Sequence, residues 1–139
     1  MDYRQFGHSI VVRIDRGEEI VATLKELCTS LNITLASVHA IGAVGKATLG
    51  LFRCATKTYE TTEFEGDYEI GALTGNVSRM AGETYLHLHC ILTDEHCRAH
   101  GGHLNAAVVS GTCELVLHII DGEIDRAFSD EIGLNLIRF

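Results

Sequence analysis

Residues 85–92 read Tyr-Leu-His-Leu-His-Cys-Ile-Leu, and this stretch alternates between two chemically different sets of side chains. Successive side chains of a β-strand point to opposite faces of the sheet, so every second residue shares a face. One face of such a strand would be uniformly apolar, made of Leu86, Leu88, Cys90 and Leu92. His87 and His89 would lie together on the opposite face. The alternation therefore predicts a strand that turns one face toward a core.

A second histidine element follows downstream, where residues 101–103 read Gly-Gly-His. Imidazole nitrogens bind transition metals, and a set of three leaves a fourth position open, as catalytic zinc sites do. We interpret His87, His89 and His103 as candidate ligands of one metal ion. The alternative is a chance pairing, because His-x-His is a short motif and the chain contains eight histidines. Spacing alone does not separate the two readings.

One amphipathic helix is predicted, over residues 17–31. Ile20, Leu24, Leu27 and Leu31 recur at helical spacing, which indicates one buried helix face. Asp15 followed by Glu18 has the form of an N-terminal capping signal. Strand-like patterns surround the helix, over residues 9–14, 34–41, 47–54, 58–64, 68–76, 85–92, 103–109 and 113–120.

These elements predict an α+β fold with a largely antiparallel sheet of about seven strands and one main helix packed on it. Helices do not alternate with strands, which argues against a doubly wound fold. The fourteen glycines separate apolar segments and are interpreted as turns, bulges or close backbone contacts. At 139 residues, the chain is expected to form a single domain over residues 1–139.

Composition and charge bear on partners and location. The net charge is −8, and the eleven basic residues are dispersed. Nucleic-acid binding depends on neutralising phosphates with Lys and Arg, so we expect no useful binding to duplex DNA at physiological salt. No apolar stretch reaches the length of a membrane span, and the first residues do not resemble a signal peptide, so a cytoplasmic location is expected. The five cysteines are scattered and odd in number, and are interpreted as reduced thiols.

Other polar residues are weaker candidates for function. Glu114 opens an apolar segment, and its carboxylate could orient a ligand imidazole or act catalytically at a metal, or could be an ordinary strand-end carboxylate. Asn76 and Arg79 could face a substrate or be turn residues. His100 is a fourth candidate ligand in a polar connection. No catalytic nucleophile is assigned, because no serine or cysteine has a recognisable activating partner.

Several elements along the chain together resemble the PPC (plants and prokaryotes conserved) domain. The matching segments are Gly17-Glu18-Glu19-Ile20, Ala40-Ile41-Gly42-Ala43, Glu69-Ile70 with Gly75-Asn76-Val77, His87-Leu88-His89, and Gly101-Gly102-His103-Leu104. The resemblance implies a largely antiparallel seven-stranded sheet and a homotrimer. It also implies, in some prokaryotic members, a metal held by the three histidines, with zinc the expected ion. In plant members DNA contact is placed in an AT-hook, an Arg-Gly-Arg core that this chain lacks.

Three functions remain open at this point: a metal-binding module that may or may not be catalytic toward a small molecule, a DNA-associated regulator, and an assembly module with structural histidines. Association into a trimer has independent support from the pattern. Residues 106–109 and 115–120 are apolar on both alternating faces, so both faces of these strands require burial. One helix cannot cover both, and a closed assembly could cover the second face.

Overall fold

The computed structural model describes residues 1–139. The elements, in chain order, are β1 (Asp2–Phe6), β2 (Ser9–Asp15), α1 (Ile20–Ser30), β3 (Ala36–Arg53), β4 (Thr58–Met80), β5 (Glu83–Thr93), β6 (Ala99–Ile119), β7 (Asp125–Ser129) and β8 (Leu134–Arg138). Six strands form one sheet in the order β1-β2-β6-β3-β4-β5, and β7 pairs with β8 in a separate hairpin. The predicted α+β class and the mostly antiparallel sheet with one helix are confirmed.

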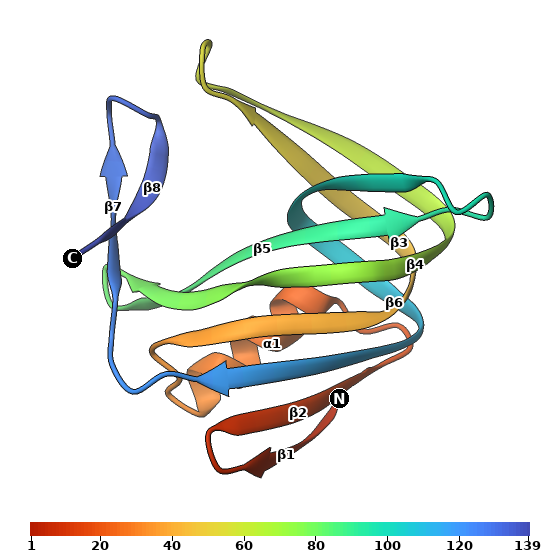
Figure 1. Ribbon diagram of the computed structural model, residues 1–139, viewed down its shortest axis with the longest axis horizontal. Coiled ribbons are helices and arrows are strands. Elements are labelled where there is room, and N and C mark those ends of the chain that lie inside the picture. The colour runs from red at the N-terminus through yellow and green to blue at the C-terminus, as the bar shows by residue number, and fades with distance from the viewer.

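The large sheet curves back on itself through β6. Most of β6 pairs with β2 and β3, whereas its first residues pair with β5, from His89↔His103 to Thr93↔Ala99. Strands β3, β4, β5 and β6 therefore close a circuit in which each neighbour is antiparallel. This closure brings β5 and the start of β6 side by side, although β6 follows β5 through a connection in the sequence (Figure 1).

Helix α1 covers the concave side of this sheet and buries the face that the sequence predicted, made of Ile20, Leu24, Leu27 and Cys28. The predicted start at residue 17 is wrong, because the helix begins at Ile20 with Glu19 as its N-cap. Residues 17 and 18 instead bind the sheet. The Gly17 amide donates to the Val109 carbonyl at 2.9 Å, and the Val109 amide donates to the Glu18 carbonyl at 3.0 Å.

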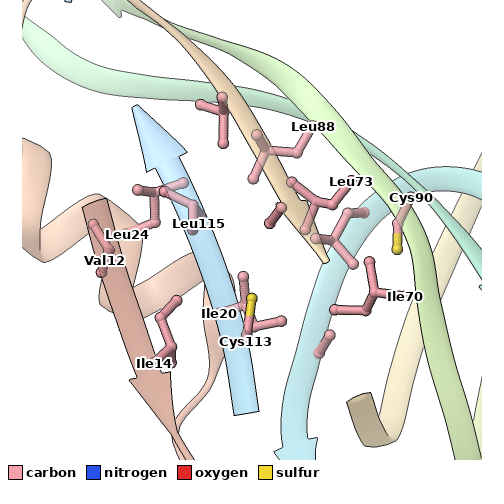
Figure 2. Close-up of a cluster of buried hydrophobic side chains, with 14 of the residues drawn as sticks. Val12, Ile14, Ile20, Leu24, Ile70, Leu73, Leu88, Cys90, Cys113 and Leu115 are labelled. Carbon is pink, nitrogen blue, oxygen red and sulfur yellow. The ribbon is translucent and has the colours of Figure 1, made fainter. Parts of the chain in front are cut away.

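One hydrophobic core of 26 buried residues lies between α1 and the sheet. Figure 2 shows side chains from the helix, such as Leu24, and from four strands converging on it, including Val12, Leu73, Leu88 and Leu115. Every one of these five side chains is at most 2 % exposed. Burial of a large apolar side chain contributes about 1.5–3 kcal/mol, so this core fixes which face of each strand points inward.

Several strands are longer than predicted. The predicted pairs of strands at 34–41 and 47–54, at 58–64 and 68–76, and at 103–109 and 113–120 are single strands β3, β4 and β6. The intervening residues form irregularities inside the strands, with register shifts at Ala40/Gly42 and Val44/Lys46. Bulges of this kind bend a strand without ending it. The glycines there therefore mark curvature of the sheet, and interpreting those gaps as strand ends was wrong.

Two extensions flank the outer side of β5. The far ends of β3 and β4 project as a two-stranded arm, and the β7–β8 hairpin stands beside β4 on the same side of β5 (Figure 1). The two meet where the Lys57 ammonium donates to the Asp130 carbonyl. The strands β1, β7 and β8 were not predicted from the sequence. None of the helices is long and apolar enough to cross a membrane, and none of the five cysteines forms a disulfide.

Candidate metal centre

The three predicted histidines lie together on the face of the sheet opposite the core. His87 and His89 come from β5, and His103 comes from β6 directly opposite His89. The ring centroids are 5.2 to 5.6 Å apart. One ring nitrogen from each residue can be chosen such that all three lie within 4.8 Å of one another. The predicted proximity of His87, His89 and His103 is therefore confirmed.

The packing of the neighbouring apolar residues orients the two histidines of β5. Leu88 and Cys90 are each 1 % exposed and point into the core, so the residues on either side of Leu88 must point away from it. Cys90 is excluded as a further ligand by the same alternation, and burial raises the pKa of its thiol to about 12. The centre therefore has three imidazole donors from its own chain and no thiolate.

Two glycines permit close backbone contacts that hold the histidine strands in place. A Cβ at Gly75 of β4 would come within 1.9 Å of the His87 carbonyl oxygen. A Cβ at Gly102 of β6 would come within 2.8 Å of the Gly50 carbonyl oxygen on β3. Gly101, which the sequence analysis grouped with Gly102, has only ordinary contacts, the nearest being 3.4 Å to Cys90. Gly75 and Gly102 thus allow β4, β5, β6 and β3 to approach closely around the centre.

Electrostatics favour neutral imidazoles. Burial lowers the pKa of His87, and the nearby His103, Arg126 and His89 lower it further. Burial also lowers the pKa of His103, with a smaller contribution from His89. The histidine rings that hydrogen-bond protein side chains belong to His118 and His100, and not to the three rings of the centre. Neutral rings with free nitrogens are the form that coordinates a metal, so the donor set fits a transition-metal ion.

A buried arginine that the sequence analysis missed lies beside the centre. Arg126 of β7 is 6 % exposed. Its guanidinium donates to Ser78 Oγ and Asn76 Oδ1, both at 2.8 Å, and its Cζ lies 4.8 Å from the centroid of the Tyr85 ring. Asn76 is the residue opposite His87 in the β4–β5 ladder. Nothing in the sequence indicated this contact, because β7 is short and its packing on β4 is a tertiary feature.

An aromatic residue borders the other side of the centre. Tyr59 of β4 packs edge-on against His103, with ring centroids 6.2 Å apart. Its hydroxyl donates to Asn105 Oδ1 at 2.6 Å, which fixes the ring. Gly50, opposite His103 in the ladder, leaves room for this ring, because a Cβ there would come within 1.8 Å of the Tyr59 hydroxyl oxygen. The β3–β4 arm thus supplies a wall of the centre.

The remaining sequence candidates lie elsewhere. The weak catalytic candidate Glu114 pairs with Arg13 and Ile41, and in that row of the sheet β3 and β4 separate it from β5. His100 is held by Asp94 Oδ2 at 3.2 Å and packs against Phe64, outside the three-histidine cluster. The guanidinium of Arg79 binds Asn32 and Thr84. Of the two strand-border candidates, Asn76 and Arg79, only Asn76 is connected to the centre.

Residues 1–121 match the family model described as the Plants and Prokaryotes Conserved (PCC) domain, also written PPC. The chain belongs to the PCC domain family. The resemblance stated from the sequence is therefore confirmed. Among curated proteins, none matches the chain.

Solved structures of PCC-like proteins share the whole fold. A candidate DNA-binding protein from Bacteroides thetaiotaomicron is 36% identical, with a TM-score of 0.97 over 99% of this chain and 96% of its own. A metal-containing protein from Archaeoglobus fulgidus is 31% identical, with a TM-score of 0.90 over 100% of this chain and 99% of its own. A PPC protein from Pyrococcus horikoshii is 28% identical, with a TM-score of 0.87 over 99% and 95%.

Proposed function

We propose that this protein is a metal-binding PCC-domain module in which His87, His89 and His103 hold one transition-metal ion per chain. The observation that carries the proposal is the convergence of three imidazole nitrogens within 4.8 Å of one another. Two of the three rings have lowered pKa values and none is committed to a hydrogen bond. The description of the A. fulgidus relative as metal-containing supports the same assignment.

Zinc is the ion we favour. Imidazole also suits nickel, copper and iron, so the donor type does not by itself select the metal. Zinc tolerates a tetrahedral arrangement of three histidines, which leaves one position for an exchangeable ligand. A zinc ion in such a setting supplies Lewis-acid chemistry to whatever occupies that position. The residues of the chain would hold the ion, and Tyr59 and Arg126 would border the open side.

Metal analysis of protein purified without a histidine tag tests this proposal. We expect about one equivalent of metal per chain, as for an open three-histidine site. His87→Ala, His89→Ala and His103→Ala should each lose it. His100→Ala and His96→Ala are matched controls, because both histidines lie outside the cluster, and they should retain it. Full occupancy in the triple variant, or loss in the controls, would refute the tripod.

An assembly role without chemistry is the main alternative, and it shares the metal. In that case removal of the ion by a chelator would dissociate or unfold the protein, whereas an open site should lose its ion and keep its fold. The core of 26 buried residues is built without contributions from the three histidines, which favours a fold that survives metal removal. Circular dichroism and light scattering before and after chelation separate these outcomes.

The description of the B. thetaiotaomicron relative as a candidate DNA-binding protein is a weaker guide for this chain. A net charge of −8 adds repulsion where binding requires contacts to phosphate. The chain also lacks an Arg-Gly-Arg element. We propose that the protein alone does not bind duplex DNA usefully. Sub-micromolar affinity at about 150 mM salt would overturn this, since non-specific binding is about 10⁻⁴–10⁻⁶ M.

We further propose that the protein is a homotrimer. The face of the sheet that carries the histidines has no layer over it within one chain, and it exposes Val11, Ile41, Ile91 and Val116. These side chains and the family resemblance support association through this face. Large exposed apolar patches of soluble proteins usually mark interaction sites.

A further inference from the structure

Arg126 is a buried cation without an anionic partner. Its guanidinium donates to Ser78 Oγ, Asn76 Oδ1 and the Asn135 carbonyl, and all three acceptors are neutral. None of the salt bridges in the chain involves Arg126. Arginine is almost never fully buried unless it is paired, so the environment of Arg126 is unusual.

The neutral contacts offset only part of the cost of burying this charge. Taking an ion out of water is expensive unless an opposite charge or several hydrogen bonds replace the hydration. A guanidinium has five N–H donors, and protein groups accept from Nε, once from Nη1 and once from Nη2. One N–H on each terminal nitrogen is left over. The Tyr85 ring, 4.8 Å from Cζ, contributes a modest cation–π attraction.

The register of the β4–β5 ladder places this guanidinium next to the three-histidine centre. Asn76 is opposite His87, and Ser78 is opposite Tyr85. Alternation along each strand puts all four side chains on one face of the sheet. Arg126 binds both β4 residues of this group, so it covers the positions immediately beside His87. The charge of Arg126 also contributes to the lowered pKa of His87.

We propose that Arg126 supplies the counter-charge for a small carboxylate-bearing molecule that binds at the open side of the three-histidine centre. The proposal rests on the metal-binding function proposed above. Two unused N–H groups on adjacent terminal nitrogens match the two oxygens of a carboxylate. The conventional reading is that Arg126 only anchors the β7–β8 hairpin, but neutral partners and an aromatic ring would anchor a neutral amide there without burying a charge.

A singly charged carboxylate fits this environment better than a phosphate does. Arg126 is the only cationic side chain that contacts the residues opposite the β5 histidines. Phosphate sites usually gather several cations or main-chain amides around a larger charge. The chain as a whole carries a net charge of −8, which disfavours multiply charged anions by long-range repulsion.

The test uses the cobalt-substituted protein and acetate as the probe, with chloride at equal ionic strength as the reference. Acetate is expected to change the visible spectrum of the cobalt ion in the wild type. In Arg126→Gln, acetate affinity should fall by at least about tenfold, because a hydrogen bond to a charged group is lost, while the metal content stays the same. Arg79→Gln is the matched control, since Arg79 binds Asn32 and Thr84, and it should leave acetate affinity unchanged.

A second measurement on the wild type covers the case in which Arg126→Gln loosens the hairpin. The Arg126 Nε–H resonance should shift on titration of acetate, and inorganic phosphate should shift it less at equal concentration. Equal acetate affinity in wild type and Arg126→Gln, an unmoved resonance, or tighter binding of phosphate would each overturn the proposal. An acetate-dependent shift in protein that takes up no metal would instead sink the metal site and leave the Arg126 anion site standing.

Discussion

Gly75 shows how a single missing side chain supports the candidate centre. It lies on β4 opposite Leu88, and a Cβ there would come within 1.9 Å of the His87 carbonyl oxygen and 2.9 Å of the Leu88 Cα. Both contacts are to backbone, which cannot rotate away as a side chain can. We expect Gly75→Ala to push β4 and β5 apart and to lower the free energy of unfolding by about 1–3 kcal/mol, as overpacking does.

The same substitution should weaken metal binding, because it displaces the backbone that carries His87. Gly101→Ala is the control, since Gly101 also faces β5 but its added Cβ would have only an ordinary contact of 3.4 Å with the Cys90 carbonyl oxygen. Urea unfolding of the metal-free proteins measures the first effect, and competition with a chelator measures the second. If Gly75→Ala and Gly101→Ala behave alike in both measurements, the close approach of β4 and β5 is not what positions His87.

At the scale of elements, the start of α1 is held by an unusual cap. The Glu19 carboxylate accepts from the Val21 and Ala22 amides of the helix and also from the Ala107 amide of β6, at 2.6 to 3.0 Å. It therefore ties the helix to the sheet. Glu19→Ala should lower the free energy of unfolding by about 1–3 kcal/mol, because it removes a cap and leaves a buried amide without an acceptor.

Glu18→Ala provides the comparison for this cap. Its carboxylate binds the Asp15 amide and the N-terminal ammonium near the surface, where such contacts contribute little. Chemical denaturation of both variants at neutral pH compares them directly, and a loss in Glu18→Ala as large as that in Glu19→Ala would contradict the assignment. Sequence reasoning chose Asp15 and Glu18 for the cap because Asp is a preferred N-cap residue and Glu is not.

The elements also show which features of the site could be predicted from sequence. The alternation in residues 85–92 sufficed to place His87 and His89 on one face, because burial of Leu88 allows only one register. The arrival of His103 opposite His89 was predicted only as a motif. Its pairing depends on the closure of β6 onto β5, a tertiary contact with no local signal. Arg126 was missed for the same reason, since its partners lie about fifty residues away in the sequence.

At the scale of the whole molecule, one row of paired residues links the exposed apolar surface to the histidine centre. The ladder runs across the sheet through Val11, Val116, His39, Thr74, His89 and His103. A groove of about 460 Å³ lies along its apolar end, lined in part by Val11, Ile41 and Val116. Because both features occupy the face opposite α1, a neighbouring chain that covers the groove would also approach the open side of the centre.

The trimer proposal predicts that light scattering will give a mass of three 15.2 kDa chains across a dilution series. Ile41→Lys should shift the mass toward one chain, because a lysine cannot be desolvated without a partner in an apolar interface. Ile41 is 59% exposed in the single chain, so this change should leave the fold intact. Phe128→Lys is the matched control: Phe128 is equally exposed at 59% but lies on the β7–β8 hairpin, and its variant should stay trimeric. A wild-type mass near one chain at micromolar concentration would sink the trimer, and a stable dimer would retain association while excluding the threefold symmetry.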